Sequence, residues 1–387
     1  MQELRKLAET AGLQAEAIYM QNRKHLDATY FAGKGFLAKT LAENSSNILL
    51  FDNELSPSQA RNIEKDYEAK VIDRTELILD IFHAHAKTKE ARLQVELAEL
   101  EYQLPRLKRL WSHLDRERGQ ASGTGGASRG MGEKQLEVDK RKVRREIALV
   151  KKELEKISQQ KETQRKNRSK IDKICLVGYT NAGKSTLFNK LTDAGVLVQD
   201  KLFATLETTT RTLQLPKGNE AILSDTVGFI SNLPHHLVAS FRATLKDVQD
   251  ADLLLHVVDS SDKNSSKYIT TVNQVLQQLE AQDIPQILVL NKLDRVEPED
   301  EISSPNSIKI SARTGANISQ LIEMIDDKLH QNVNVELQIP HTQQQKVNLL
   351  HNSAKIVKKE YNEKGLLVEA IINKCDLKRF RKYLVKK

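Results

Sequence analysis

The chain has 387 residues, two to three times the usual size of one domain. Hydrophobic residues make up 39% and charged residues 29%, a composition that argues against wholesale disorder. No apolar run approaches the roughly 20 residues needed to span a bilayer. Two cysteines, Cys175 and Cys375, provide no disulfide framework, and the first residues lack the apolar run of a secretory signal. We therefore expect a cytoplasmic protein of several domains.

The net charge of +8 is unevenly distributed. Residues 1–100 carry −3 and 101–170 carry +10, whereas 171–340 carry −7 and 341–387 carry +8. A basic run is often only a solvated face. Two basic blocks beside an acidic segment instead favour a polyanionic partner, for which RNA or a ribonucleoprotein is the natural candidate.

Residues 1–90 alternate short apolar runs with helical patterns. The pattern predicts strands at 15–20, 47–51 and 70–73, and helices at 35–43 and 56–67. Ser56 as N-cap, Pro57 and Gln59 form the start signal of the second helix. This alternation predicts a small parallel sheet covered by helices. The turn Gly33–Gly35 is interpreted as a tight turn before a helix rather than a phosphate site.

Residues 91–165 predict a long antiparallel helical hairpin. Apolar residues recur at three- and four-residue steps in two stretches, among mostly charged neighbours. They are Leu93, Leu97, Leu100, Leu104 and Leu107, then Val143, Ile147, Val150, Leu154 and Ile157. Pro105 should end or kink the first helix. These apolar positions are expected to form the contact between the two helices.

A glycine-rich segment, 119–132, joins the two helices and contains six glycines in fourteen residues. Such a segment buries too little apolar surface to order by itself, and a flexible linker is the simplest interpretation. Its place at the tip of a basic hairpin favours a second one, in which the tip orders on contact with a partner.

Residues 171–333 contain the pattern G-x-x-x-x-G-K-[ST] of a P-loop, between an apolar strand and a helix. It comprises Gly178, Tyr179, Thr180, Asn181, Ala182, Gly183, Lys184 and Ser185. Glycines let backbone N–H groups surround the phosphates, and the helix N-terminus adds a favourable dipole. Lys184 is expected to reach the β- and γ-phosphates and Ser185 to bind Mg²⁺.

A second motif indicates the base. Asn291, Lys292, Leu293 and Asp294 follow the apolar strand 286–290, at the carboxyl end where α/β sheets bind ligands. The Asp294 carboxylate can accept hydrogen bonds from N1–H and the 2-amino group of guanine, whereas adenine offers neither donor. GTP and GDP are therefore the expected nucleotides. Ser311, Ala312 and Arg313 follow another short strand and fit a loop that closes over the base.

Two further motifs match the switch segments of a GTPase. Asp225, Thr226, Val227 and Gly228 follow the strand 221–224; Asp225 would hold Mg²⁺ through water, and the Gly228 N–H would bond the γ-phosphate. Phe203, Ala204, Thr205, Leu206 and Glu207 occupy the place of switch I. Thr205 is the expected second hydroxyl on Mg²⁺, with Thr208, Thr209 and Thr210 as alternatives. Lys184, Thr205 and Gly228 are thus candidate catalytic residues, and Ser185 and Thr205 candidate metal ligands.

The expected fold is α/β and multidomain. The GTPase domain, 171–333, has a mostly parallel sheet with helices on both faces. It is preceded by the small parallel α/β domain and the hairpin, and followed by a small basic α+β tail, 334–387. We expect this tail to run strand, helix, strand, helix, with strands at 335–339 and 366–372.

The chain resembles bacterial HflX-type GTPases, beyond the generic GTPase motifs. The resemblance is carried by 51–63, 71–82 and 93–98, by the glycine segment together with 132–137, and by 203–206. It covers 1–333, and the tail matches only in its strand and helix pattern. It implies a GTPase that binds the large (50S) ribosomal subunit and ribosomal RNA and acts on stalled or idle ribosomes, through splitting, rescue or biogenesis. Similar proteins often have Asp-Pro after the switch threonine, where this chain has Glu207-Thr208.

The residue after Gly228 is Phe229, where Ras-like proteins carry the glutamine that orients the attacking water. Slow intrinsic hydrolysis, stimulated by a partner, is therefore expected. A monomer that binds no DNA is also expected. One alternative is a signalling or assembly GTPase whose hairpin binds a protein. Another is an ATP-driven RNA remodeller with a second nucleotide site at Gly33–Gly35.

Overall fold

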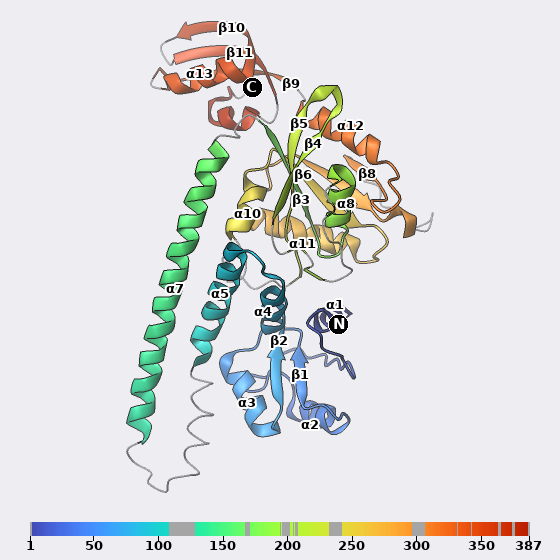
Figure 1. Cartoon of the computed structure of the whole chain (residues 1–387), viewed down its shortest axis with the longest axis vertical. Helices are drawn as coiled ribbons and strands as arrows, with labels where there is room; N and C mark the ends of the chain where they lie inside the picture. The colour runs from blue at the N-terminus through green and yellow to red at the C-terminus, as the bar shows by residue number, and fades with distance from the viewer. Residues whose placement is uncertain are drawn as a thin grey trace. The chain divides into compact units, whose positions relative to one another are not determined.

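The computed structural model describes residues 2–107, 128–166, 171–193, 195, 202–203, 205, 208–231, 242–295, 306–330, 332–341, 343–362, 365–373 and 376–385. The chain forms two compact units (Figure 1). The first is Met1–Ser169 with Gln199–Glu207 and Val227–Leu245; the second is Lys170–Val198, Thr208–Thr226 and Lys246–Lys387. No helix in these described ranges is long and apolar enough to cross a membrane.

The first unit begins with a small α/β domain. Its elements are α1 (Gln2–Thr10), α2 (Lys34–Ala42), β1 (Ile48–Phe51), α3 (Pro57–Tyr67), β2 (Lys70–Asp73) and α4 (Arg74–His85). β1 and β2 pair in parallel, with Leu49 opposite Val71, as the sequence predicted. The predicted start of α3 is also confirmed, because Ser56 and Gln59 form a reciprocal capping box.

The strand predicted at 15–20 is wrong. This segment has no regular secondary structure, and Ile18 and Met20 are 51% and 75% exposed. Alternating apolar residues become a strand only where a neighbouring strand completes their backbone hydrogen bonds. Among the described residues, none forms a backbone hydrogen bond between 15–20 and β1.

The helical hairpin is present in the first unit. α5 (Lys89–Gln103) ends in the 3-10 turn η1 (Leu104–Arg106), which contains Pro105 at the predicted break. α7 (Ser128–Lys166) lies antiparallel beside α5 (Figure 1), and two ion pairs join them, Lys89 with Glu153 and Lys151 with Glu101. Residues 119–127 of the glycine segment lie outside the described residues. Ser128 to Gly132 are helical, so α7 begins earlier than the glycine content indicated.

The GTPase fold in the second unit has a six-stranded sheet in the order β4-β5-β3-β6-β7-β8. All neighbouring strands are parallel except β4 and β5, which confirms the mostly parallel sheet. Its elements are β3 (Asp172–Gly178), α8 (Lys184–Thr192), β4 (Thr209–Gln214), η2 (Pro216–Gly218), β5 (Glu220–Asp225), α10 (Arg242–Gln249), β6 (Leu253–Asp259), α11 (Ser265–Gln278), β7 (Gln286–Asn291), η3 (Leu293–Arg295), β8 (Ser307–Lys309) and α12 (Ile318–Leu329). α10 begins in the first unit and ends in the second.

Helices cover both faces of this sheet. α8 and α12 join alternate strand residues in one buried apolar cluster, to which Phe188 and Leu321 contribute. α11 contacts β3 and β6, yet none of its residues belongs to that cluster, so it covers the opposite face. Burial on both faces explains why these strands read as continuous apolar runs.

The C-terminal part has its own antiparallel sheet, in the order β10-β11-β9. It contains β9 (Asn332–Ile339), α13 (Gln344–Ser353), β10 (Ala354–Asn362), β11 (Gly365–Asn373) and the 3-10 helix η4 (Asp376–Tyr383). The two predicted strands lie within β9 and β11. The prediction missed β10, whose residues from Val357 onward are all exposed and half of them charged, so that no apolar alternation marks it.

Candidate nucleotide-binding site

The P-loop connects β3 to α8, and two of its glycines are sterically required. Gly178 has φ +153°, and a Cβ there would lie 2.2 Å from the Val257 carbonyl oxygen. Gly183 has φ +92°, and a Cβ there would lie 2.3 Å from Asn291 Nδ2. Both are conformations and approaches that only glycine tolerates. The loop therefore has the backbone shape that a phosphate cradle needs.

Lys184 and Ser185 are the first residues of α8, and their polar groups bond different partners. Lys184 is 6% exposed, and its Nζ donates to the carbonyl oxygens of Tyr179 at 2.9 Å and Gly178 at 3.3 Å. Burial lowers the pKa of Lys184 to about 8. Ser185 Oγ donates to Asp225 Oδ2 at 2.7 Å, so the hydroxyl and carboxylate predicted near Mg²⁺ lie together. Thr226, the next residue, donates instead to the Leu176 carbonyl, at 2.6 Å.

Asn291 and Lys292, at the end of β7, form hydrogen bonds to the backbone of the P-loop. Asn291 Nδ2 donates to the Ala182 carbonyl at 2.9 Å, and its Oδ1 accepts the Ala312 N–H at 3.0 Å. Lys292 Nζ donates to the Asn181 carbonyl at 3.0 Å and to Asp259 Oδ2 at 2.6 Å. The structure thus brings three sequence-distant motifs together. Sequence reasoning missed Asp259, although its place at the end of β6, beside β7, was a usable signal.

Asp294 lies in η3 and is exposed, as a group that contacts a base must be. Ser311 Oγ donates to Asp294 Oδ1 at 2.6 Å. This hydrogen bond is the main reason why the pKa of Asp294 is lowered, with a smaller contribution from the charge of Arg313. The Asp294 carboxylate is therefore held ionised and oriented, the state that accepts two N–H groups of guanine.

Tyr268 and His256 lie near the loop and were not predicted from the sequence. The ring of Tyr179 stacks on Tyr268 of α11, with centroids 4.0 Å apart. His256 in β6 is 2% exposed and lies opposite Val177 of β3. Burial, aided by the charge of Lys184, lowers the pKa of His256 to about 4.

Acid should therefore destabilise this fold through His256. The folded-state pKa lies below the unfolded value of 6.5, so between pH 6.5 and 4 only the unfolded chain binds this proton. The free energy of unfolding should fall across that window, by up to about 3 kcal/mol from this group. Thermal unfolding of the native protein and His256→Leu, compared from pH 7 to 4, isolates this contribution. His351→Gln, at an exposed position, should keep the native acid sensitivity; equal acid sensitivity in His256→Leu would contradict the assignment.

The predicted switch residues are divided between the two units. Asp225 and Thr226 belong to it, whereas Phe203, Thr205, Val227 and Gly228 belong to the first unit. Ala204, Leu206 and Glu207 lie outside the described residues. Thr209 and Thr210 are paired within β4, opposite Asp225 and Ser224, which leaves Thr205 and Thr208 as the threonines outside a strand. The roles assigned to Thr205 and Gly228 stay predictions.

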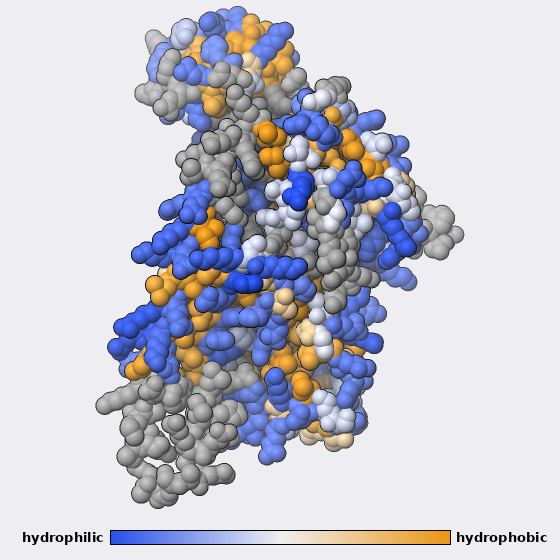
Figure 2. All heavy atoms as spheres, viewed as in Figure 1, coloured by the Kyte–Doolittle hydropathy of each residue, from blue (hydrophilic) through white to orange (hydrophobic). Residues whose placement is uncertain are grey.

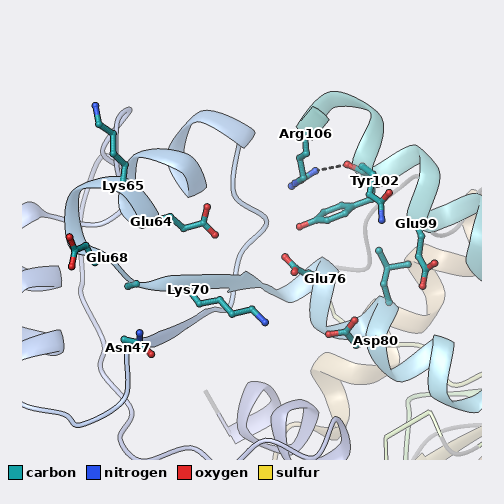
Figure 3. A pocket seen from close by; sticks show the side chains of 13 residues that line it. Asn47, Glu64, Lys65, Glu68, Lys70, Glu76, Asp80, Glu99, Tyr102 and Arg106 are labelled. Carbon is teal, nitrogen blue, oxygen red and sulfur yellow. Dashed lines mark hydrogen bonds between the residues drawn. The ribbon is translucent and has the colours of Figure 1, made fainter. Parts of the chain in front are cut away.

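The N-terminal α/β domain contains a cavity of about 890 Å³ between α3, β2, α4 and α5 (Figure 3). Its lining includes the carboxylates of Glu64, Glu68, Glu76, Asp80 and Glu99. Three cations, Lys65, Lys70 and Arg106, also line the cavity, but the carboxylates outnumber them, and an excess of negative charge disfavours a polyphosphate. The Gly33–Gly35 turn is equally unsuited, since the Gly33 N–H donates to the Gln21 side chain and its φ of −68° is ordinary. Neither feature supports a second nucleotide site.

Comparison with known proteins decides the family. GTPase HflX from Magnetococcus marinus is 48% identical over 332 residues, covering 83% of this chain and 76% of the relative. The chain belongs to the HflX family of GTPases. HflX from Escherichia coli is 44% identical over 340 residues, covering 85% of this chain and 79% of the relative. Hydrolysis of GTP, and binding of GTP and GDP, are thus activities of this chain.

Family models divide the HflX chain into three parts. A GTP-binding GTPase N-terminal model matches 1–83, a GTP-binding GTPase middle region matches 85–168, and a model described as 50S ribosome-binding GTPase matches 173–292. Among solved structures, a GTP-binding protein from Sulfolobus solfataricus in complex with GDP is 25% identical, with a TM-score of 0.43, covering 84% of this chain and 94% of that one.

Proposed function

We propose that the chain is a GTP-controlled switch that binds the large ribosomal subunit through its helical hairpin and acts on stalled or idle ribosomes. The exposed basic face of α7 carries the proposal. Arg144, Arg145 and Lys152 are exposed, and within the described residues they form no ion pair. Figure 2 shows hydrophilic side chains along this helix. The family description of the GTPase region as 50S ribosome-binding supports the same partner.

Unpaired cations on a helix suit RNA phosphates. A 30-residue helical arm spans about 45 Å, so α7 can present these charges along an RNA groove. Recognition would depend on charge and shape, because binding of this kind reads the backbone rather than the bases. Each phosphate contact releases counterions, which makes the affinity fall steeply with salt.

The P-loop, the two switch segments and Mg²⁺ would together perform the hydrolysis. Ser185 Oγ and Asp225 Oδ2 are hard oxygen ligands of the kind Mg²⁺ prefers, and they already lie within 2.7 Å. Ser185 and Thr205 would ligate the ion directly and Asp225 through water, and the ion would neutralise charge on the phosphates. Lys184 binds the β- and γ-phosphates, and Gly228 donates its N–H to the γ-phosphate.

The residue after Gly228 supports the need for a partner in hydrolysis. Phe229 is 3% exposed, and its side chain has no polar atom with which to orient water. The isolated protein should therefore hydrolyse GTP slowly, while the ordered switch segments hold the partner-binding state until hydrolysis releases it. A ribosomal surface would complete the site, by adding a group or by moving the switch segments.

The deciding experiment measures GTP hydrolysis by the purified protein, alone and with 50S subunits, at low and high salt. We expect a low basal rate that rises at least about tenfold with 50S subunits and loses this rise at high salt. Replacing Arg144, Arg145 and Lys152 by Glu should remove the stimulation and leave the basal rate intact. The control is the double variant Lys263→Glu and Lys267→Glu, which changes exposed cations of the GTPase unit.

A stimulation that the hairpin variant retains would place the ribosome contact elsewhere. If 50S subunits did not change the hydrolysis rate of the native protein or of either variant, the ribosomal role would be overturned, while the GTPase activity itself would stand. Capture of a protein by the hairpin, with no response to RNA, would favour a signalling or assembly GTPase.

A further inference from the structure

Arg74, the first residue of α4, is a buried cation with an unexpected hydrogen-bond partner. It is 3% exposed, and its guanidinium is ion-paired with Glu3 and with Asp52 Oδ1, the latter at 2.6 Å. The same guanidinium donates through Nη2 to the backbone carbonyl of Ser231 at 2.9 Å. The planar guanidinium group of Arg74 thus joins the N-terminal domain to a backbone atom 157 residues away in sequence.

Ser231 lies directly behind the switch II motif. Only Phe229 and Ile230 separate it from Gly228, and both side chains are nearly inaccessible, at 3% and 1% exposure. A loop whose carbonyl is held by a buried, charged donor has fewer conformations than a free one. Its Gly228 N–H is therefore partly positioned before a γ-phosphate arrives.

The same helix also holds switch I. Phe203, two residues before Thr205, is 2% exposed and packs edge-on against Phe82 of α4, with ring centroids 4.8 Å apart. Phe203 and Thr205 of switch I, and the part of switch II from Val227 to Ser231, group with the N-terminal unit. α4 is thus a common support for the two segments that must respond to the γ-phosphate.

We propose that Arg74 is a positioning residue for GTP hydrolysis, which holds switch II through the Ser231 carbonyl so that Gly228 meets the γ-phosphate. Arg74 touches neither nucleotide nor Mg²⁺ in this role. Its effect is confined to the γ-phosphate, because GDP has no γ-phosphate to which Gly228 could donate. Loss of Arg74 should slow hydrolysis without weakening GDP binding. This inference rests on the GTPase activity and is independent of ribosome binding.

The test is single-turnover GTP hydrolysis by the full chain, combined with GDP binding. In Arg74→Ala the rate should fall about tenfold, as expected for loss of a charge-assisted hydrogen bond at a preorganised site. The dissociation constant of GDP should stay within about twofold of native. Arg74→Lys keeps a cationic donor and should recover part of the rate.

Arg106→Ala is the matched control. Arg106 is 6% exposed in the same domain, and it donates to the Leu55 carbonyl and to Asp73 rather than to a switch residue. Its loss should lower the melting temperature at least as much as loss of Arg74, with hydrolysis unchanged. If Arg74→Ala does not fold, the test passes to Arg74→Lys, for which a threefold to fivefold loss of rate is expected.

Three results would overturn the proposal. One is hydrolysis within twofold of native in Arg74→Ala, or in Arg74→Lys where only that variant folds. Another is an equal loss of rate in Arg106→Ala, which would make both arginines merely structural. A rise in the rate would show that Arg74 restrains switch II instead of positioning it for hydrolysis.

Discussion

Replacing Asp294 by Asn should exchange guanine for xanthine specificity. Asp294 is exposed at the end of the site, and the Ser311 hydroxyl orients its carboxylate and lowers its pKa. A carboxylate accepts two N–H groups of guanine, whereas an amide offers one acceptor and a donor. The donor faces the guanine 2-amino group unfavourably, but it matches the 2-oxo group of xanthine.

The expected loss of GTP affinity is large because the lost hydrogen bonds are accepted by a charged carboxylate. GTP affinity should fall at least about 100-fold in Asp294→Asn, while XTP binds and is hydrolysed at a rate close to that of GTP in the native chain. Competition of each nucleotide against a fluorescent analogue measures both changes. Asp327→Asn on α12 removes the same charge from an exposed position of the same unit and should leave both affinities unchanged. Loss of GTP binding with no gain for XTP would indicate a folding defect rather than base recognition.

Sequence reasoning placed the nucleotide motifs well because each is local. The P-loop, the strand before Asn291 and the strand before Asp225 are contiguous apolar runs followed by polar residues, and parallel strands bring their carboxyl ends to one edge. This topology forces the motifs together without any knowledge of side-chain contacts. Order along the chain was therefore enough to predict the fold and the meeting of these motifs at one edge of the sheet.

The contacts that join the motifs could not be predicted in this way. Asn291 was interpreted as part of base recognition, yet its amide bonds Ala182 and Ala312, as a brace between loops. The bond from Arg74 to the Ser231 carbonyl carries no sequence pattern at all, because it depends on how distant elements pack. The strand predicted at 15–20 failed for the same reason. A periodic pattern specifies a face, but neighbouring elements decide whether that face is paired.

Replacing Lys184 by Ala should remove most of the hydrolytic activity. The Lys184 ammonium is buried among the carbonyls of the P-loop, where water screens its charge weakly. Negative charge develops on the phosphate oxygens in the transition state. Removing one preorganised positive group that stabilises this charge lowers the rate about 100- to 1,000-fold. Single-turnover hydrolysis measures the loss. Lys190→Ala, an exposed position on the same helix, should leave the rate unchanged.

The lowered pKa of Lys184 adds a second, directional signature. With a pKa of about 8, the side chain is largely neutral at pH 9, whereas bound phosphates favour its charged form. GTP binding should therefore take up a proton, and GTP affinity should fall as the pH rises from 8 to 9.5. In Lys184→Ala this part of the pH dependence should vanish, while Lys190→Ala should retain it. If the GTP affinity of the native protein did not change over this pH range, the charge of Lys184 would not contribute to phosphate binding. The electrostatic reason for the expected loss of rate would then be removed.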